Sequence, residues 1–142
     1  CALPILTACG GVLRYVLQYS GLGDLIGNAV ASANLPIVLV AFIVAALVRI
    51  CVGSATVAMT MAAGIIAAMP GISELPPLYL ACVVAAVAGG STVCSHFNDS
   101  GFWLVRSLVG VDEKTNLKTW TIMETLVGFS GFVVAFIISL FV

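Results

Sequence analysis

The polar side chains of this chain gather in one stretch, "SHFNDSGFW", at Ser95 to Trp103. Asp99 follows His96 by three positions, so the two side chains share a face if the segment is helical. A carboxylate beside an imidazole in a partly dehydrated cavity can take up and release a proton at physiological pH. A second interpretation is structural, because Asp99, Asn98 and Ser100 are all suited to cap the helix that follows. The two roles are compatible.

A second cluster, "GSAT", combines small residues with two hydroxyl groups at Gly53 to Thr56. If Ser54 and Ala55 open a half-helix, its free backbone N–H groups and its dipole form an anion site. Broken helices of transporters use this device for anionic substrates. Alternatively, the small residues only let helices approach closely. Arg49, one helical turn earlier, could bind a substrate carboxylate through two parallel hydrogen bonds or extend to the membrane interface.

The remaining candidates favour structural roles. Thr121 and Glu124 have the spacing of a capping box at the start of the last helix, and Trp120 suits an interfacial anchor. Asp24 is expected at a surface. The five cysteines show no metal-ligand spacing and lie mostly among apolar residues, so we interpret them as reduced core residues. We expect neither a metal nor a cofactor.

The elements that must position these residues are long and apolar. Residues 36–69, as one straight helix, would measure about 50 Å, which is too long for one membrane crossing and too short for two with a turn. The same holds for residues 76–109. Each is therefore expected to be a broken crossing or a hairpin that turns back, with the breaks at 53–56 and 89–100. Such backbone is tolerated at membrane depth only inside protein or beside a watery cavity.

Turn signals separate these segments. "PGISELPP" predicts a turn, "VDEKTNLK" predicts a polar loop, and residues 120–142 predict a last crossing. Earlier in the chain we expect a segment at 6–19, with Thr7, Gly10 and Gly11 at the tip of a re-entrant turn, and an interfacial helix at 22–31. The basic residues near the last loop place that loop in the cytoplasm and the proline turn outside.

Composition sets the class. The chain has 142 residues, of which 62% are hydrophobic and 8% charged, and its net charge is −1. A soluble core of this size could not be covered by so few polar residues, and nothing basic suggests nucleic acid. We therefore expect an all-α, multi-pass membrane protein with broken or re-entrant helices. Residues 1–142 are expected to form the C-terminal part of one transmembrane transporter domain, with residues 1–5 ("CALPI") as non-native sequence.

Three functions from different classes remain open at this point. The first is a secondary transporter of a small organic anion. The second is an intramembrane serine hydrolase using Ser54 and His96, which is disfavoured because no glycine-containing elbow surrounds the serine. The third is a structural or channel subunit, in which neutralising Asp99 would alter stability but not pH-dependent flux. The site proposed for the transporter comprises Arg49, Gly53, Ser54, Ala55, Thr56, Ser95, His96, Asn98, Asp99 and Ser100.

Three motifs in order resemble the gluconate permease family: "RICVGSATVAMTMAAGI", "SHFNDSGFWL" and "LKTWTIMETL". The resemblance implies proton symport of gluconate or a related sugar acid across the bacterial inner membrane. It also implies a fold of two inverted halves with re-entrant hairpins. The alternatives are another small organic anion or sodium coupling. A homo-oligomer in the lipid bilayer is also possible. Departures at Cys9, Cys51, Val52 and Phe97 leave the sugar acid undefined.

Overall fold

The computed structural model describes residues 16, 19–20 and 35–142, and this part of the chain is helical without strands. The predicted all-α class is therefore confirmed. Residues 16 and 19 are helical, in line with the segment expected at 6–19. The re-entrant tip at Thr7, Gly10 and Gly11, the interfacial helix at 22–31 and Asp24 lie outside the described residues.

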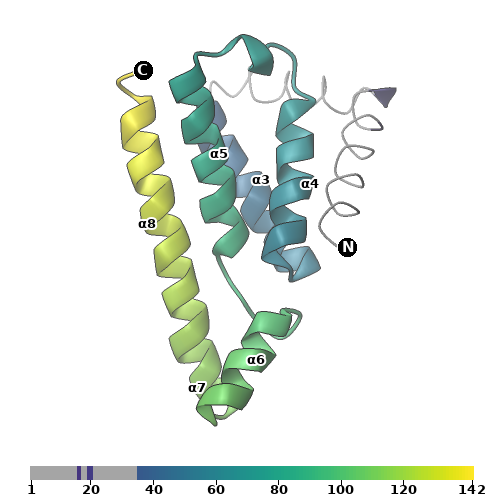
Figure 1. The fold of residues 1–142 in the computed structure, drawn as a ribbon, viewed down its shortest axis with the longest axis vertical. Coiled ribbons are helices and arrows are strands. Elements are labelled where there is room, and N and C mark those ends of the chain that lie inside the picture. The colour runs from purple at the N-terminus through teal and green to yellow at the C-terminus, as the bar shows by residue number, and fades with distance from the viewer. Residues whose placement is uncertain (1–15, 17–18, 21–34) are drawn as a thin grey trace.

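The first long apolar segment is a hairpin. Helix α3 (Ile37–Val52) ends at Gly53, which adopts the left-handed conformation with φ 82°, and helix α4 (Ala55–Ala67) starts directly afterwards. In Figure 1, α4 turns back alongside α3. Glycine reaches positive φ without the steric cost of a Cβ, so the predicted break at Gly53 is confirmed. Of the two predicted alternatives, the structure shows the hairpin.

The proline turn joins this hairpin to the next helix, as the sequence predicts. It contains the short 3₁₀-helix η1 (Ile72–Glu74), and helix α5 (Pro77–Thr92) begins with a proline at its first position. Proline suits this position because the first N–H of a helix has no intrahelical partner.

The second long segment is broken and does not form a hairpin. Helix α5 ends at Thr92, an irregular segment follows at residues 93–99, and helix α6 (Ser100–Val109) continues away from the hairpin. The break was expected at 89–100 but starts only at residue 93, because Gly89 to Thr92 are helical. Their small side chains serve packing instead. A Cβ on Gly90 would lie 2.4 Å from the carbonyl oxygen of Phe42 on α3.

The last helix starts earlier than predicted. Helix α7 (Glu113–Asn116), the π-helical turn η2 (Leu117–Thr121) and helix α8 (Ile122–Ser139) follow without interruption. Together they form a 27-residue helix that is long and apolar enough to cross a membrane. The expectation of a polar loop over "VDEKTNLK" is wrong, because Asp112 caps a helix there through the Thr115 N–H. The capping box is wrong as well, since Thr121 lies inside the helix.

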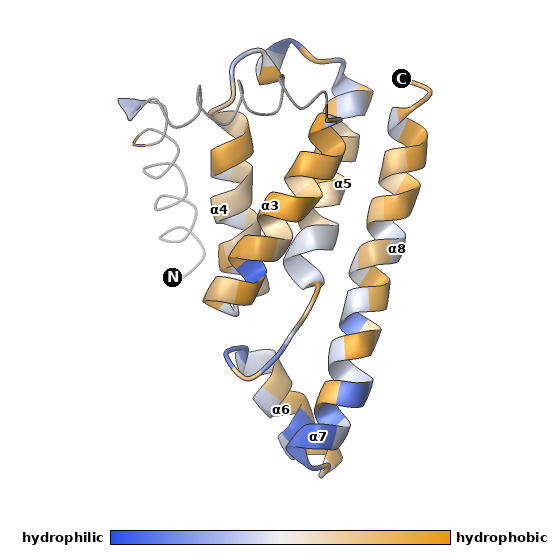
Figure 2. Ribbon diagram, turned by 180° about the vertical axis from the view of Figure 1, so that it is seen from behind, coloured by the Kyte–Doolittle hydropathy of each residue, from blue (hydrophilic) through white to orange (hydrophobic). Residues whose placement is uncertain are grey.

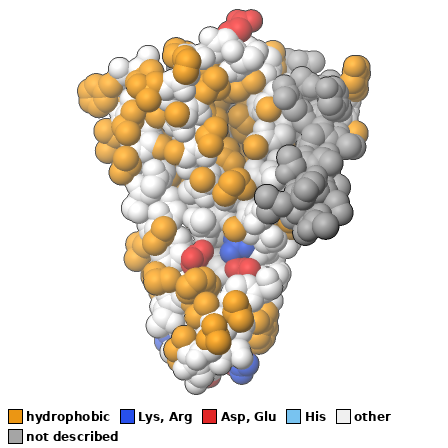
Figure 3. Space-filling model, in the orientation of Figure 1, with side chains coloured by type: hydrophobic (Ala, Val, Ile, Leu, Met, Phe, Trp, Pro, Cys, Tyr) orange, Lys and Arg blue, Asp and Glu red, His pale blue; other side chains and the backbone are white. Residues whose placement is uncertain are grey.

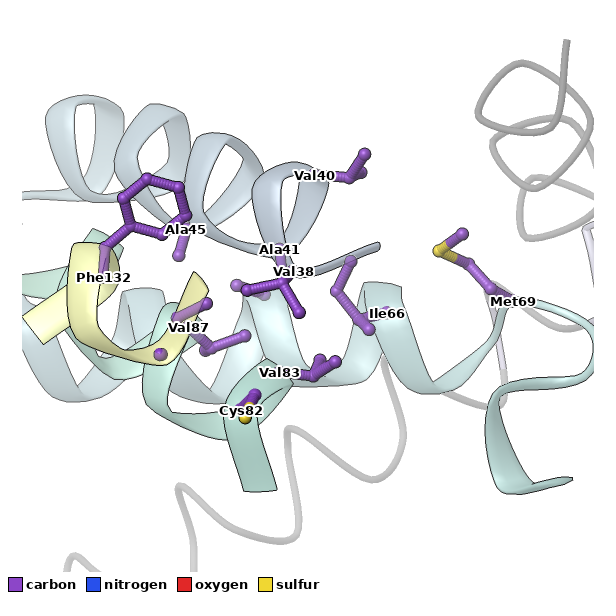
Figure 4. Packing of buried hydrophobic residues seen from close by; sticks show 13 residues of the cluster. Val38, Val40, Ala41, Ala45, Ile66, Met69, Cys82, Val83, Val87 and Phe132 are labelled. Carbon is purple, nitrogen blue, oxygen red and sulfur yellow. The ribbon is translucent and has the colours of Figure 1, made fainter. Parts of the chain in front are cut away.

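Helices α3, α4, α5 and α8 pack around one apolar core, shown in Figure 4. Small residues such as Ala41, Ala45 and Ala86 are fully buried in it, so the helix backbones approach closely. Phe132 of α8 stacks on Phe42 of α3 with ring centroids 4.2 Å apart. The outer faces stay apolar too, with Leu126, Val127, Phe129, Val134 and Ile137 exposed along α8. Such a surface suits lipid more than water.

Candidate functional site

Polar groups are concentrated at one level of the molecule. Figure 2 shows the upper helices as largely hydrophobic and α7, at the opposite end, as hydrophilic. Between them, Figure 3 shows acidic side chains beside a basic one in the middle of an apolar face. The residues that compose this cluster come from the two breaks and from the last helix.

The two helix breaks touch each other at Gly53 and Asn98. A Cβ placed on Gly53 would lie 2.3 Å from the Asn98 carbonyl oxygen, closer than any real contact. The Asn98 amide in turn donates to the Ile50 carbonyl at 2.8 Å and so satisfies one of the open carbonyls at the C-terminal end of α3. The glycine at position 53 is therefore required twice, for its dihedral angles and for this approach.

An ion pair joins the same two breaks. Arg49 Nη2 lies 2.6 Å from Asp99 Oδ2, and the Arg49 side chain is 2% exposed. The guanidinium also donates through Nη1 to the Gly53 carbonyl. The alternative in which Arg49 extends to the membrane interface is therefore wrong, because its charge is held inside the protein by a carboxylate 50 positions away.

Asp99 has several donors around it. Besides Arg49, the Ser95 hydroxyl donates to Oδ2, and the Gly101 backbone N–H donates to Oδ1 at 2.9 Å. The last contact is a helix cap for α6, as predicted. The structure thus shows both a capping contact and an ion pair at one carboxylate.

His96 does not join Asp99 as expected. Residues 94–98 are not helical, so the two side chains do not share a helix face. The His96 Nδ1 atom instead accepts from the Asn98 backbone N–H at 3.4 Å, and the hydrogen bond between His96 and Asp99 is a backbone one. The basis for a carboxylate–imidazole pair at these residues is therefore absent.

The residues after Gly53 make few of the polar contacts that their side chains allow. The Ser54 hydroxyl accepts from the Val57 N–H at 3.5 Å and caps α4. Ala55 is half-buried, and Thr56 is exposed. Ser100 is exposed at the start of α6. Among the hydrogen bonds of the described residues, none joins Ser54 to His96, so these two do not form the nucleophile–base pair that a hydrolase needs.

The last helix contributes residues that the sequence analysis did not assign to the site. The Trp120 indole N–H donates to the Ser95 hydroxyl at 3.0 Å, and the Thr121 hydroxyl donates to the Ser95 carbonyl. The Thr125 hydroxyl accepts from the Cys94 N–H at 3.0 Å. Trp120 therefore directs its polar end to the break rather than to a membrane interface. The motif "LKTWTIMETL" was a signal for this region, but no spacing rule links it to Ser95.

Glu124 is a third charged group at this level. It is half-buried on α8 and lies within electrostatic range of both Arg49 and Asp99. The expected cap role is wrong, since α8 is already helical for several turns before it. Its position one turn after Trp120 places it beside the residues that hold the second break.

The arrangement leaves Arg49 with an unused donor. Its Nε atom is buried and has no acceptor within the described residues, whereas both Nη atoms are engaged. A buried N–H without a partner is costly, and an incoming carboxylate oxygen would satisfy it. Chemically, a guanidinium beside two carboxylates has the groups needed to bind an anion and to take up a proton.

Comparison with known proteins agrees with this picture. The chain is 44% identical over 135 residues to the low-affinity gluconate transporter of Escherichia coli (strain K12) and 39% identical over 139 residues to a gluconate permease of Pseudomonas aeruginosa. It is 37% identical over 129 residues to the Gnt-II system L-idonate transporter of Escherichia coli (strain K12). These matches cover 94%, 98% and 91% of this chain but only 30%, 30% and 29% of the relatives.

No solved structure matches the chain. The sequence model described as "GntP family permease" matches residues 2–141, which is nearly the whole chain. With buried charges at two helix breaks and an apolar exterior, this match leads to one conclusion: the chain belongs to the GntP permease family, a family of membrane transporters.

Proposed function

We propose that this chain supplies part of the substrate and proton site of a symporter that takes up gluconate or a related sugar acid. The protein would lie in the bacterial inner membrane and cross it several times. The observation that carries the proposal is the Arg49–Asp99 ion pair, which joins two helix breaks inside an apolar protein. Ionisable groups at membrane depth are expensive and are retained where transport requires them.

The chemistry of the cluster suits a sugar acid. Arg49 offers a free Nε–H to a carboxylate oxygen, and guanidinium groups bind carboxylates with good geometry. Asn98 is exposed beside the pair and uses only its amide nitrogen for α3, so its side-chain oxygen is available to accept from a substrate hydroxyl. Relatives named as gluconate and L-idonate transporters support the same substrate class.

A vesicle experiment tests the proposal. The full-length protein that carries this chain is reconstituted, and uptake of labelled gluconate is measured under an imposed pH gradient and, separately, under a sodium gradient. We expect accumulation that follows the pH gradient in wild type and is lost in Asp99→Asn. Ser54→Ala reports whether the start of α4 takes part. Glu74→Gln, in the exposed proline turn, is the control and should behave as wild type.

Two outcomes would contradict the proposal. Uptake that follows the sodium gradient and ignores the pH gradient would show that sodium, not the proton, is the coupling ion. Wild-type uptake by both Asp99→Asn and Ser54→Ala would show that the substrate binds elsewhere. Downhill flux of gluconate without any coupling would instead indicate a channel.

A further inference from the structure

We propose that Glu124 carries the coupled proton, whereas Asp99 stays ionised as the fixed counter-ion of Arg49. The inference rests on the proposed symport and names the residue that performs its proton step. It reverses the expectation drawn from "SHFNDSGFW", in which Asp99 itself exchanges the proton.

The first argument is the unequal surroundings of the two carboxylates. Asp99 accepts from Arg49, from the Ser95 hydroxyl and from the Gly101 N–H. Glu124 has no hydrogen-bond donor among the residues that the structure describes, although it is half-buried. A carboxylate with three donors, one of them a cation, holds its negative charge well. A carboxylate without donors in a partly dry setting is the one that accepts a proton.

The second argument is the charge of the cluster. Asp99 and Glu124 together carry two negative charges beside one guanidinium, so the empty cluster already has an excess of negative charge. A substrate carboxylate on Arg49 would add another. Protonation of Glu124, which converts its carboxylate into a neutral carboxylic acid, restores the original charge of the cluster. The substrate and the proton therefore bind in a mutually favourable way, which is what symport requires.

The groups that face Glu124 are few. Helix α3 contributes Arg49, and the second break contributes Asp99. The second break also brings the titratable Cys94 to α8, where its backbone N–H donates to Thr125. Helix α5, which packs along α8, carries no charged side chain, and its titratable groups Tyr79 and Cys82 lie in its first half. The Arg49–Asp99 pair is therefore the main source of electrostatic influence on Glu124 within the described residues.

The test compares Glu124→Gln with wild type in the full-length protein. A gradient of roughly one pH unit supports about tenfold accumulation per coupled proton. We expect wild type to approach this ratio and Glu124→Gln to stop at equal concentrations, while exchange of labelled for unlabelled gluconate persists. Proton uptake on addition of gluconate, followed with a pH indicator in weak buffer, should vanish in the same variant. Glu74→Gln serves as the matched control.

The outcomes separate this inference from the proposed function. If wild type shows no response to the pH gradient, the symport proposal fails first. If wild type is coupled and Glu124→Gln still accumulates gluconate like wild type, Glu124 does not carry the proton. Should Glu124→Gln fail to fold, Glu124→Asp decides: a shifted pH dependence of uptake supports the role, and an unchanged one overturns it.

Discussion

At the residue scale, Arg49 and Asp99 depend on each other. The arginine lies in the last turn of α3 and the aspartate caps the start of α6, and both are buried. Two charges taken out of water attract each other strongly but lose their hydration, so such a pair adds little net stability. Losing one partner is different, because the other charge is then left unpaired.

A double-mutant cycle measures this dependence. We expect Arg49→Met and Asp99→Asn each to lower the free energy of unfolding by about 3–5 kcal/mol, and the double variant to lose less than the sum. Thermal unfolding of the full-length protein in detergent is the measurement. Additive losses would show that the two side chains do not interact in solution.

Gly53 provides a second test at this scale. Gly53→Ala forces a Cβ into positive φ and against the Asn98 carbonyl, whereas Gly71→Ala has a similar φ of 77° but open space around it. Positive φ costs about 1–2 kcal/mol for alanine, and the contact adds about 1–3 kcal/mol at Gly53 alone. Unfolding temperatures of the two variants should therefore differ clearly. Equal losses would mean that the breaks do not touch.

At the element scale, glycines set the distance between α5 and α8. A Cβ on Gly128 of α8 would lie 2.4 Å from the Gly89 carbonyl oxygen and 2.4 Å from the Thr92 hydroxyl, whereas a Cβ on Gly131 of the same helix meets nothing within 4 Å. The two positions thus separate helix packing from helix propensity.

We expect Gly128→Ala to destabilise the protein by about 1–3 kcal/mol, since the helices must move apart. Gly131→Ala should be neutral or stabilising by up to about 1 kcal/mol, because alanine is the better helix former. Thermal unfolding in detergent again gives the answer. A loss at Gly131 as large as that at Gly128 would exclude the close approach of α5 and α8.

The ends of the helices show which features of the fold the sequence could predict and which it could not. "GSAT" and "GGST" contain nearly the same residue types, yet Gly53 ends a helix and Gly89 lies inside one. The difference comes from the helices that pack against each glycine, which local sequence does not reveal. The break at Gly53, the proline turn and the cap at Asp99 depend on local chemistry, and the sequence predicts them, whereas it leaves a hairpin and a broken crossing open for residues 36–69. The start of the last helix was predicted late because Asp112 and its neighbours look like a loop by composition.

At the scale of the whole molecule, the candidate site unites residues far apart in the chain. Arg49 meets a carboxylate 50 positions later, and Ser95 meets Trp120 and Thr121, 25 and 26 positions later. The sequence suggests Arg49, Asn98 and Asp99 as polar residues in an apolar chain, but it does not pair them. Glu124 was assigned to a cap for the same reason, because the sequence does not show that Arg49 and Asp99 lie near it in the fold.

The topology gives a prediction for the whole molecule. The proline turn lies at one end of the structure and the α6–α7 corner at the other. In a full-length protein without its native cysteines, we expect Glu74→Cys to react with an impermeant thiol reagent from outside the cell. Lys114→Cys should react only from the cytoplasmic side, in line with the basic residues there. Reaction of both from one side would contradict the proposed crossing.

The irregular segment 93–99 has two attachments. Near its start, Cys94 is held by α8 and Ser95 by η2. At its end, Asn98 and Asp99 are held by α3. Segment 93–99 is therefore fastened at both ends, through Ser95 to the last helix and through Asp99 to α3. A change of charge at Arg49 or Asp99 acts directly on the hydrogen bonds that fix the backbone connection between these two helices.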